Sequence, residues 1–243
     1  MASNTDIRAT AAKVYFLPVE MRVPLKFGPE TVTSVTCARI RLRVKNQSGE
    51  IAEGWGETPL SAQWVWPSTL SYEARDAVLK DFTLRLASAW QTFDQSGHPM
   101  EIGHGFQEQV LPGILKAFNS AREGLEPMPW LGALVCCSAF DIALHDAYGV
   151  LHQKPVYETY NDHYMNRDLA HFLEPAPGSA LLRTTSTNWP AGWRHPPASP
   201  MSASASSVAW VTQSTPRLQP SANAASSSRL ATGSSSAPNE PAC

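Results

Sequence analysis

The stretch that decides the fold is "TVTSVTCARIRLRVKN", residues 31–46. Its second half alternates strictly, with Ile40, Leu42 and Val44 on one side and basic residues on the other. A period of two predicts a β-strand with one buried face and one solvent-exposed face. Because the following "QSGE" is typical of a hairpin turn, "IAEGWGETPL" (51–60) is expected to return as an antiparallel partner.

A further strand is predicted before this hairpin. "KVYFLPVEMRVPL" (13–25) has a β-rich start and then alternates, and a turn at Gly28-Pro29 follows it. The three strands predict an antiparallel meander with one wet face. Residues 1–12 are expected to be a flexible N-terminus.

The next segments have helical signals. Ser71 is a predicted N-cap with Glu73 in the first turn, and apolar residues then recur at four-residue steps. A shorter helix broken by Gly and Pro follows, and residues 128–149 predict a long buried helix that ends at Gly149. The element order predicts an α+β domain over residues 13–150, a three-stranded antiparallel meander followed by a helical bundle.

Composition restricts the classes of function. The net charge of −2, without a basic stripe, argues against nucleic-acid binding. The most apolar window, residues 130–144, is too short for a bilayer and contains Asp141, so no membrane partner is expected. No C-x-x-C occurs, and adjacent Cys136 and Cys137 are expected to be buried thiols. A cytoplasmic location is expected.

The composition changes sharply near residue 183. Between residues 183 and 243, Ser, Ala and Pro supply 33 of 61 positions, and there is no Lys, Asp or Ile. Such a stretch buries too little apolar surface to offset its ordering entropy. Residues 183–243 are therefore predicted to be a low-complexity, disordered tail, and residues 151–182 a linker leading toward another domain.

Three motifs then carry a family resemblance. "RVPLKFG" (22–28), "GWGETPL" (54–60) and "AFDIALHDAYG" (139–149), the last followed by "KPVY", occur in this order. Over residues 13–160 the chain resembles the N-terminal capping domain of the mandelate racemase/muconate lactonizing enzyme branch of the enolase superfamily. In that family a (β/α) barrel follows the capping domain.

The resemblance implies a chemistry and two loops. Relatives abstract a proton α to a carboxylate, with Mg²⁺ stabilising the enediolate and a Lys or His as base. The capping domain closes two loops over the small carboxylate substrate. The resemblance places the following residues in these loops: Lys26, Phe27 and Gly28 in the first, and Glu57, Thr58 and Leu60 in the second. For Glu57, a structural salt bridge is as good an interpretation as a substrate contact.

The sequence departs from the family after the capping domain. A full barrel takes about 200 residues or more, whereas 93 residues follow Val150. The family's Lys-x-Lys cannot be placed because Lys154 is the last lysine, and after Asp168 only Glu174 and Glu240 are acidic. We therefore expect only the start of a barrel, no catalytic or metal-binding residue and no cofactor in this chain, although Mg²⁺ is expected in a full-length relative.

Two origins of the tail stay open. One is a frameshift near residues 182–187, because "SSVAWVTQSTP" (206–216), read in another frame, permits a Gly-Gly…Asp-Pro-x-Asp segment expected in relatives. The other is a genuine disordered extension. The sequence thus predicts a truncated family member that is inactive as given and self-associates through its barrel-facing surface. The alternatives are an interaction module for an intact paralogue, or a full-length enzyme hidden by a sequencing error.

Some other candidate sites have a simpler interpretation. His145-Asp146 could be an acid–base pair, but neighbouring helical residues point about 100° apart, so a role at the core edge is favoured. Gly54-x-Gly56 lacks the rest of a dinucleotide motif and is interpreted as a strand-end turn.

Histidines and tryptophans supply the remaining candidates. His163 and His171 could ligate a metal only with a third ligand from elsewhere, which no motif supplies. Trp64 and Trp66 are expected to pack rather than to stack on a ligand.

Overall fold

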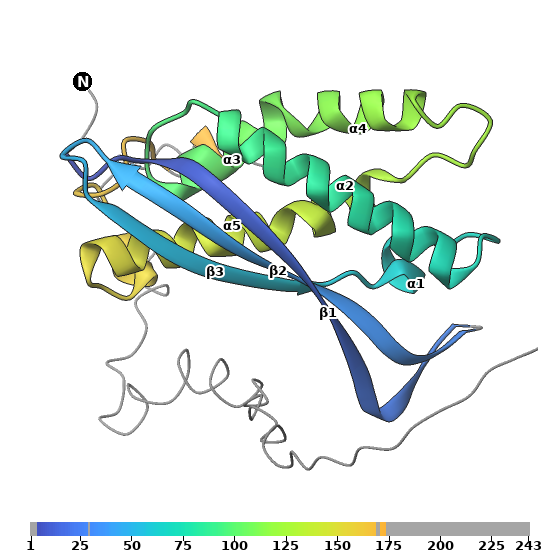
Figure 1. Ribbon diagram of the computed structural model, residues 1–243. Helices are drawn as coiled ribbons and strands as arrows, with labels where there is room; N and C mark the ends of the chain where they lie inside the picture. The colour runs from blue at the N-terminus through green and yellow to red at the C-terminus, as the bar shows by residue number, and fades with distance from the viewer. Residues whose placement is uncertain (1–3, 29, 169–170, 174–243) are drawn as a thin grey trace, which may run out of the picture. The chain divides into compact units, whose positions relative to one another are not determined.

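The sheet has three antiparallel strands in the order β1-β2-β3. The computed structural model describes residues 4–28, 30–168 and 171–173. The strands are β1 (Ile7–Phe27), β2 (Glu30–Asn46) and β3 (Ile51–Pro59), and helices cover one face of the sheet (Figure 1). The predicted α+β class and the meander are confirmed.

The alternation in β2 divides the two faces of the sheet as predicted. Ile40, Leu42 and Val44 have no exposed surface. On the opposite face Arg39 pairs with Glu57, and Arg41 and Arg43 both pair with Glu53. The outer face is therefore a ladder of ion pairs in water, and the apolar face forms the core.

β1 begins earlier than the sequence predicts. It starts at Ile7, inside the segment 1–12 that was expected to be flexible. The Ile7 side chain is fully buried, and its backbone N–H and C=O both pair with Gly97 at 3.1 Å. A partner 90 positions away orders this end of the strand, which no local pattern reveals.

β1 also bends near its end. Its register with β2 shifts between Glu20, which faces Ser34, and Leu25, which faces Val32. Residues 21–24 therefore stand opposite the single residue Thr33. Extra residues in one strand bend a sheet, and the outer part of the hairpin turns back toward the start of α2 (Figure 1).

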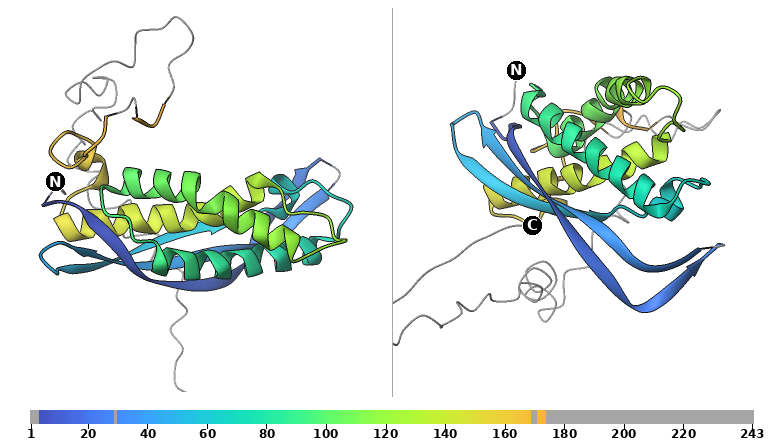
Figure 2. Two further views of the ribbon diagram at one scale, coloured as in Figure 1. Left: turned by 90° about the horizontal axis from the view of Figure 1, so that it is seen from above. Right: turned by 45° about the vertical axis from the view of Figure 1, so that its right-hand side comes forward.

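Five α-helices and one 3₁₀ helix occur within the described residues. They are α1 (Ala62–Val65), α2 (Tyr72–Thr92), α3 (Pro99–Gln109), α4 (Leu111–Ser120), α5 (Trp130–His152) and η1 (Val156–Thr159). Ser71 caps α2 as predicted, since its hydroxyl accepts the N–H of Ala74 at 3.2 Å. Figure 2 shows the helices as a layer over the sheet.

α5 is the central helix of the core. It packs against β2, β3 and α2, and Cys136 and Cys137 are buried in it. Burial raises the pKa of the Cys136 thiol to about 12, so this thiol stays protonated. α5 is the one helix in the described part of the chain whose length and apolar composition would let it cross a membrane. Its packing is that of a core helix.

The end of α5 differs from the prediction. Gly149 lies inside the helix, which continues to His152 and ends with Gln153 in the left-handed conformation (φ 53°). The N–H of Lys154 returns to the carbonyl of Gly149 at 3.0 Å, a usual closure of a helix C-terminus. Gly149 is needed for space, because a Cβ there would lie 2.9 Å from the Lys154 carbonyl oxygen. The predicted tail 183–243 lies outside the described residues, as does the predicted barrel entry beyond Leu173.

Candidate functional site

The two predicted capping loops lie on the two strands that flank β2. The first is the turn of the β1–β2 hairpin, where Lys26 faces Thr31. The second is the end of β3, where Thr58 faces Ala38 and Pro59 faces Cys37. The hairpin turn is at the start of β2, and Cys37 is seven positions further along, so β3 ends partway along β2 and the hairpin extends beyond that end (Figure 1).

The hairpin turn is open to solvent. Lys26 is exposed, and Gly28 has a φ of +57° with no atom within 4 Å of where a Cβ would be. Glycine suits this position because of its left-handed backbone. The side chain of Phe27 lies outside the described residues, so its predicted role stays a prediction.

Glu57 forms a structural ion pair. Its Oε2 lies 2.6 Å from Nε of Arg39 across the β2–β3 pair, and both side chains are partly exposed. Burial, with Glu57 adding a like charge, raises the pKa of the neighbouring Cys37 thiol to about 11. The salt-bridge interpretation therefore describes this state of the domain, and a substrate contact by Glu57 stays a prediction.

Thr58 and Leu60 are less accessible. Thr58 is half-buried. Leu60 has no exposed surface, and its N–H donates to the carbonyl of Thr36 at 2.8 Å. In this domain Leu60 presents no surface to a ligand, so its role is to anchor the chain where it leaves β3.

The Gly54-x-Gly56 motif is inside β3 and forms no turn, which makes the strand-end interpretation wrong. A Cβ on Gly54 would overlap the backbone of Ala147 and Ala143, and one on Gly56 would overlap that of Ala139. The two glycines therefore let α5 approach the strand closely. A small-x-small pattern opposite an alanine-rich helix was the available signal for this contact.

His145 and Asp146 act separately, as predicted. Nδ1 of His145 lies 2.9 Å from the carbonyl oxygen of Asp141 in the preceding turn. The Asp146 carboxylate instead accepts the backbone N–H of Trp55 at 2.8 Å. Neither side chain is oriented to exchange a proton with the other.

The two tryptophans after β3 have different environments. Trp66 is buried and donates its indole N–H to Glu126 at 2.7 Å, as the packing prediction requires. Trp64 is 51% exposed and lies at the surface.

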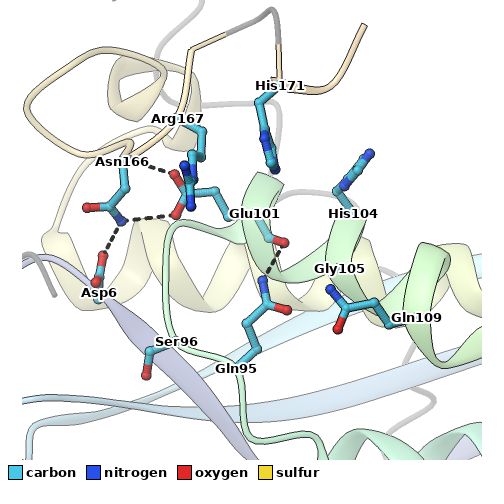
Figure 3. Close-up of a pocket in the computed structure, with 10 residues that line it drawn as sticks. All are labelled: Asp6, Gln95, Ser96, Glu101, His104, Gly105, Gln109, Asn166, Arg167 and His171. Atoms are coloured by element: carbon cyan, nitrogen blue, oxygen red, sulfur yellow. Dashed lines mark hydrogen bonds between the residues drawn. The ribbon is translucent and has the colours of Figure 1, made fainter. Parts of the chain in front are cut away.

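A polar pocket of about 660 Å³ lies at the end of the domain where β1 begins (Figure 3). Its walls come from the start of β1, the loop before α3, α3 itself and the segment after η1. The lining residues are Asp6, Gln95, Ser96, Glu101, His104, Gly105, Gln109, Asn166, Arg167 and His171.

The buried carboxylates of this pocket are held by one asparagine. The side-chain amide of Asn166 donates to Asp6 at 2.8 Å and to Glu101 at 3.0 Å, and its backbone N–H donates to Glu101 at 2.6 Å. Gln95 also donates to the Glu101 carbonyl at 2.8 Å. The carboxylates therefore fasten the segment after η1 to the domain (Figure 3).

His98 also holds the segment that contains η1 and Asn166, through a contact with η1. Its Nδ1 accepts the N–H of Met100 at 3.2 Å and caps α3, while its N–H pairs with the carboxylate of Glu101 at 3.1 Å. Its Nε2 lies 3.0 Å from the hydroxyl of Thr159 in η1. Because Nδ1 accepts, the neutral ring carries its proton on Nε2 and donates to Thr159. This cap was not predicted, because histidine is an unusual N-cap residue.

No metal site occurs in the part of the chain that the structure describes, since no three His, Cys, Asp or Glu side chains gather closely enough to hold an ion. His171 lines the pocket beside His104, whereas His163 contacts Tyr164. Mg²⁺ therefore does not fit the described residues.

Comparison with known proteins gives matches among solved structures. No family model and no curated protein matches the sequence. A dipeptide epimerase from Enterococcus faecalis, in complex with Mg and L-Leu-L-Tyr, matches at 14% identity and a TM-score of 0.37, over 64% of this chain and 35% of that chain.

Two further structures match a similar share of this chain. A mandelate racemase/muconate lactonizing enzyme-like protein from Rubrobacter xylanophilus matches at 18% identity and a TM-score of 0.33, over 62% of this chain and 33% of that chain. An enolase from Streptomyces coelicolor matches at 22% identity and a TM-score of 0.33, over 67% and 33%. This chain thus spans about a third of the length of the structures it matches.

Proposed function

We propose that the described domain is the capping domain of an Mg²⁺-dependent enzyme that abstracts a proton α to the carboxylate of a small acid. One observation carries the proposal. The two segments assigned to substrate loops by resemblance both pair with β2, Lys26 at its start and Glu57 beside Arg39, and β3 ends in the direction of the hairpin turn although 30 residues separate the two segments. Loops that close over one ligand need to emerge in the same direction.

The capping domain contributes binding and not the reaction step. Lys26 would offer a cation to a substrate carboxylate, and Glu57 would exchange its partner Arg39 for a polar group of the substrate. The base and the metal would belong to a barrel. We propose that the chain as given is inactive, because no Lys-x-Lys follows Lys154 and only Glu174 and Glu240 are acidic after Asp168.

The test compares two proteins, the chain as given and a chain whose reading frame is restored near the codons for residues 182–187. Each is incubated with Mg²⁺ in D₂O with mandelate, dipeptides and sugar acids, and exchange of the α-proton is followed by NMR. We expect no exchange from the first and EDTA-sensitive exchange from the second. Exchange by the chain as given would refute its inactivity, and a restored chain inert on every acid would refute the enzyme assignment.

Resequencing the genomic DNA across residues 176–193 is the prior step. A discrepancy of one or two bases that restores the frame would make the natural product a longer enzyme. An unchanged DNA sequence would leave the given chain as the product and favour the second candidate function below.

The second candidate is an interaction module that binds an intact paralogue or a second copy of itself. The supporting observation is that three apolar side chains of α5 are exposed, since Leu131, Ile142 and Val150 are 39%, 47% and 54% exposed. Light scattering of the purified chain would then report a dimer or a larger species, and Ile142→Glu would return it to a monomer. A monomer at all concentrations that also fails to retain the paralogue would exclude this candidate.

A further inference from the structure

We propose that Arg75 is a positioning residue that ties the two capping loops to each other through the first turn of α2. Its role in substrate closure rests on the proposed function, whereas the tie itself is a property of the described domain. The hydrogen bonds of Arg75 go to the segments that carry the predicted loop residues, and Arg75 acts through these segments.

Arg75 is a buried cation with acceptors from three segments. Its side chain is 3% exposed. Nη1 donates to the carbonyl of Trp66 at 2.8 Å and to that of Ala62 at 3.4 Å, and Nε donates to that of Ser71 at 3.3 Å. Nη2 donates to both carboxylate oxygens of Glu30, at 3.2 and 3.3 Å.

These acceptors belong to the continuation of each capping loop. Glu30 is the first residue of β2 and faces Phe27 across the hairpin turn. Ala62 and Trp66 lie in the turn of chain that follows Leu60, immediately after the second loop. One guanidinium therefore holds the return strand of the first loop and the exit of the second loop.

The tie is strong because Arg75 cannot remain buried without its acceptors. Removing a charged group from water costs several kcal/mol unless hydrogen bonds and an opposite charge replace the lost hydration. Arginine presents its donors in a fixed planar fork, so the three acceptor segments must keep one relative geometry. Displacement of Glu30 or of residues 62–66 would expose the guanidinium of Arg75 or leave it without a partner.

The hairpin turn depends on this tie more than the rest of the sheet does. Beyond the bend at residues 21–24, only three pairs join the strands, from Leu25–Val32 to Phe27–Glu30. An isolated two-stranded hairpin is marginally stable in water. Val32 is buried and helps to hold the hairpin, and the Glu30–Arg75 pair fixes its far end. Order at one capping loop is thereby transmitted to the other.

Hydrogen exchange of the full chain, followed by mass spectrometry, tests the tie without substrate or activity. Glu30→Gln removes the charge that holds the hairpin and leaves the carbonyl acceptors. We expect exchange to rise about tenfold in residues 25–33 and, because Arg75 loses its counter-charge, to rise by a smaller factor in residues 60–68. Arg75→Met should raise exchange in both segments. Arg85→Met is the matched control, because Arg85 lies on the same helix in an exposed pair with Asp81 at 3.4 Å.

The variants separate the outcomes. Unchanged exchange in residues 25–33 of Glu30→Gln, or a rise in only one of the two segments in Arg75→Met, would overturn the proposal. If Arg75→Met does not fold, Arg75→Lys replaces it, since one ammonium cannot reach all three acceptor segments. A rise in both segments then supports the tie, and a rise in one alone refutes it. The amide exchange experiment is independent of the α-proton exchange assay, so the enzyme assignment can fail while the Arg75 tie is supported.

Discussion

The carboxylate of Asp146 in α5 accepts the backbone N–H of Trp55 in β3, with the oxygen 2.8 Å from the nitrogen. Trp55 lies between Gly54 and Gly56, the two residues that let the helix backbone approach the strand. β3 is an edge strand, and its outward N–H groups need partners. The close approach of α5 brings a charged acceptor to that edge, so the Gly-x-Gly spacing and Asp146 form one structural device.

The glycines give the first prediction. Gly54→Ala and Gly56→Ala would push a methyl group into the backbone of α5, which has no rotamer by which to yield. We expect each to lower the free energy of unfolding by about 3 kcal/mol or more. Urea denaturation followed by circular dichroism measures this.

Gly113→Ala is the matched control for these variants. Gly113 lies in α4, and a Cβ there meets nothing within 4 Å. Alanine is the better helix former, so this change should be neutral or should stabilise by up to about 1 kcal/mol. Equal effects at all three glycines would contradict the steric explanation.

Asp146→Ala gives the second prediction. The change leaves the Trp55 N–H without its charged acceptor, and because both residues are exposed and water can replace the carboxylate, the bond contributes about 0.5–1.5 kcal/mol. We expect a loss of stability in this range by thermal or urea unfolding. Asp146→Asn, which keeps an acceptor oxygen, should lose less. Asp81→Ala, at an exposed pair on α2, should change stability by less than about 0.5 kcal/mol.

Local sequence patterns predicted β2 and the start of α2, whose structure depends on neighbouring residues. The alternation through Ile40, Leu42 and Val44 identified β2 and its two faces, and the Ser71 cap identified the start of α2. The start of β1 at Ile7 could not be predicted, because its order comes from Gly97. The sequence contains no local signal for such a contact.

The candidate site shows the same division. Motif resemblance assigned Lys26 and Glu57 to two loops, and the register of the strands pairs the first with the start of β2 and the second with Arg39, midway along it. The burial of Leu60 and the pairing of Arg75 with Glu30 depend on how α1 and α2 pack. Residue type favours an exposed position for arginine, so only the packed structure reveals this buried cation.

Asn166 gives the third prediction. Asn166→Ala removes the amide that satisfies Asp6 and Glu101, which are 3% and 8% exposed. We expect a loss of about 1–3 kcal/mol of stability and faster hydrogen exchange in residues 156–168, because these carboxylates hold that segment. Asp162→Ala, at an exposed position of the same segment, is the control. If residues 156–168 exchange at the same rate in Asn166→Ala as in the wild type, other contacts hold this segment.

His98 gives the last prediction, a dependence of stability on pH. Burial, with smaller contributions from the charges of His145 and His152, lowers the pKa of His98 from 6.5 to about 3. The unfolded chain therefore takes up a proton below pH 6.5 that the folded domain does not. The neutral His98 therefore contributes fully to the free energy of unfolding above pH 6.5. Below pH 6.5 this free energy falls by about 1.4 kcal/mol per pH unit, until the pH approaches 3.

The measurement compares urea denaturation at pH 7 and pH 5 for the wild type and His98→Asn. Asparagine keeps an acceptor for the cap of α3 but does not titrate, and it loses the hydrogen bond to Thr159. His98→Asn should therefore be less stable at pH 7 yet lose about 2 kcal/mol less than the wild type on going to pH 5. Comparing the two proteins cancels the acidic groups that also titrate in this range, such as Glu53 and Glu126. His163→Asn, at an exposed position, should follow the wild type. If His98→Asn follows it as well, His98 is protonated in the folded domain, and the hydrogen bond from Met100 to its Nδ1 cannot be present at pH 5.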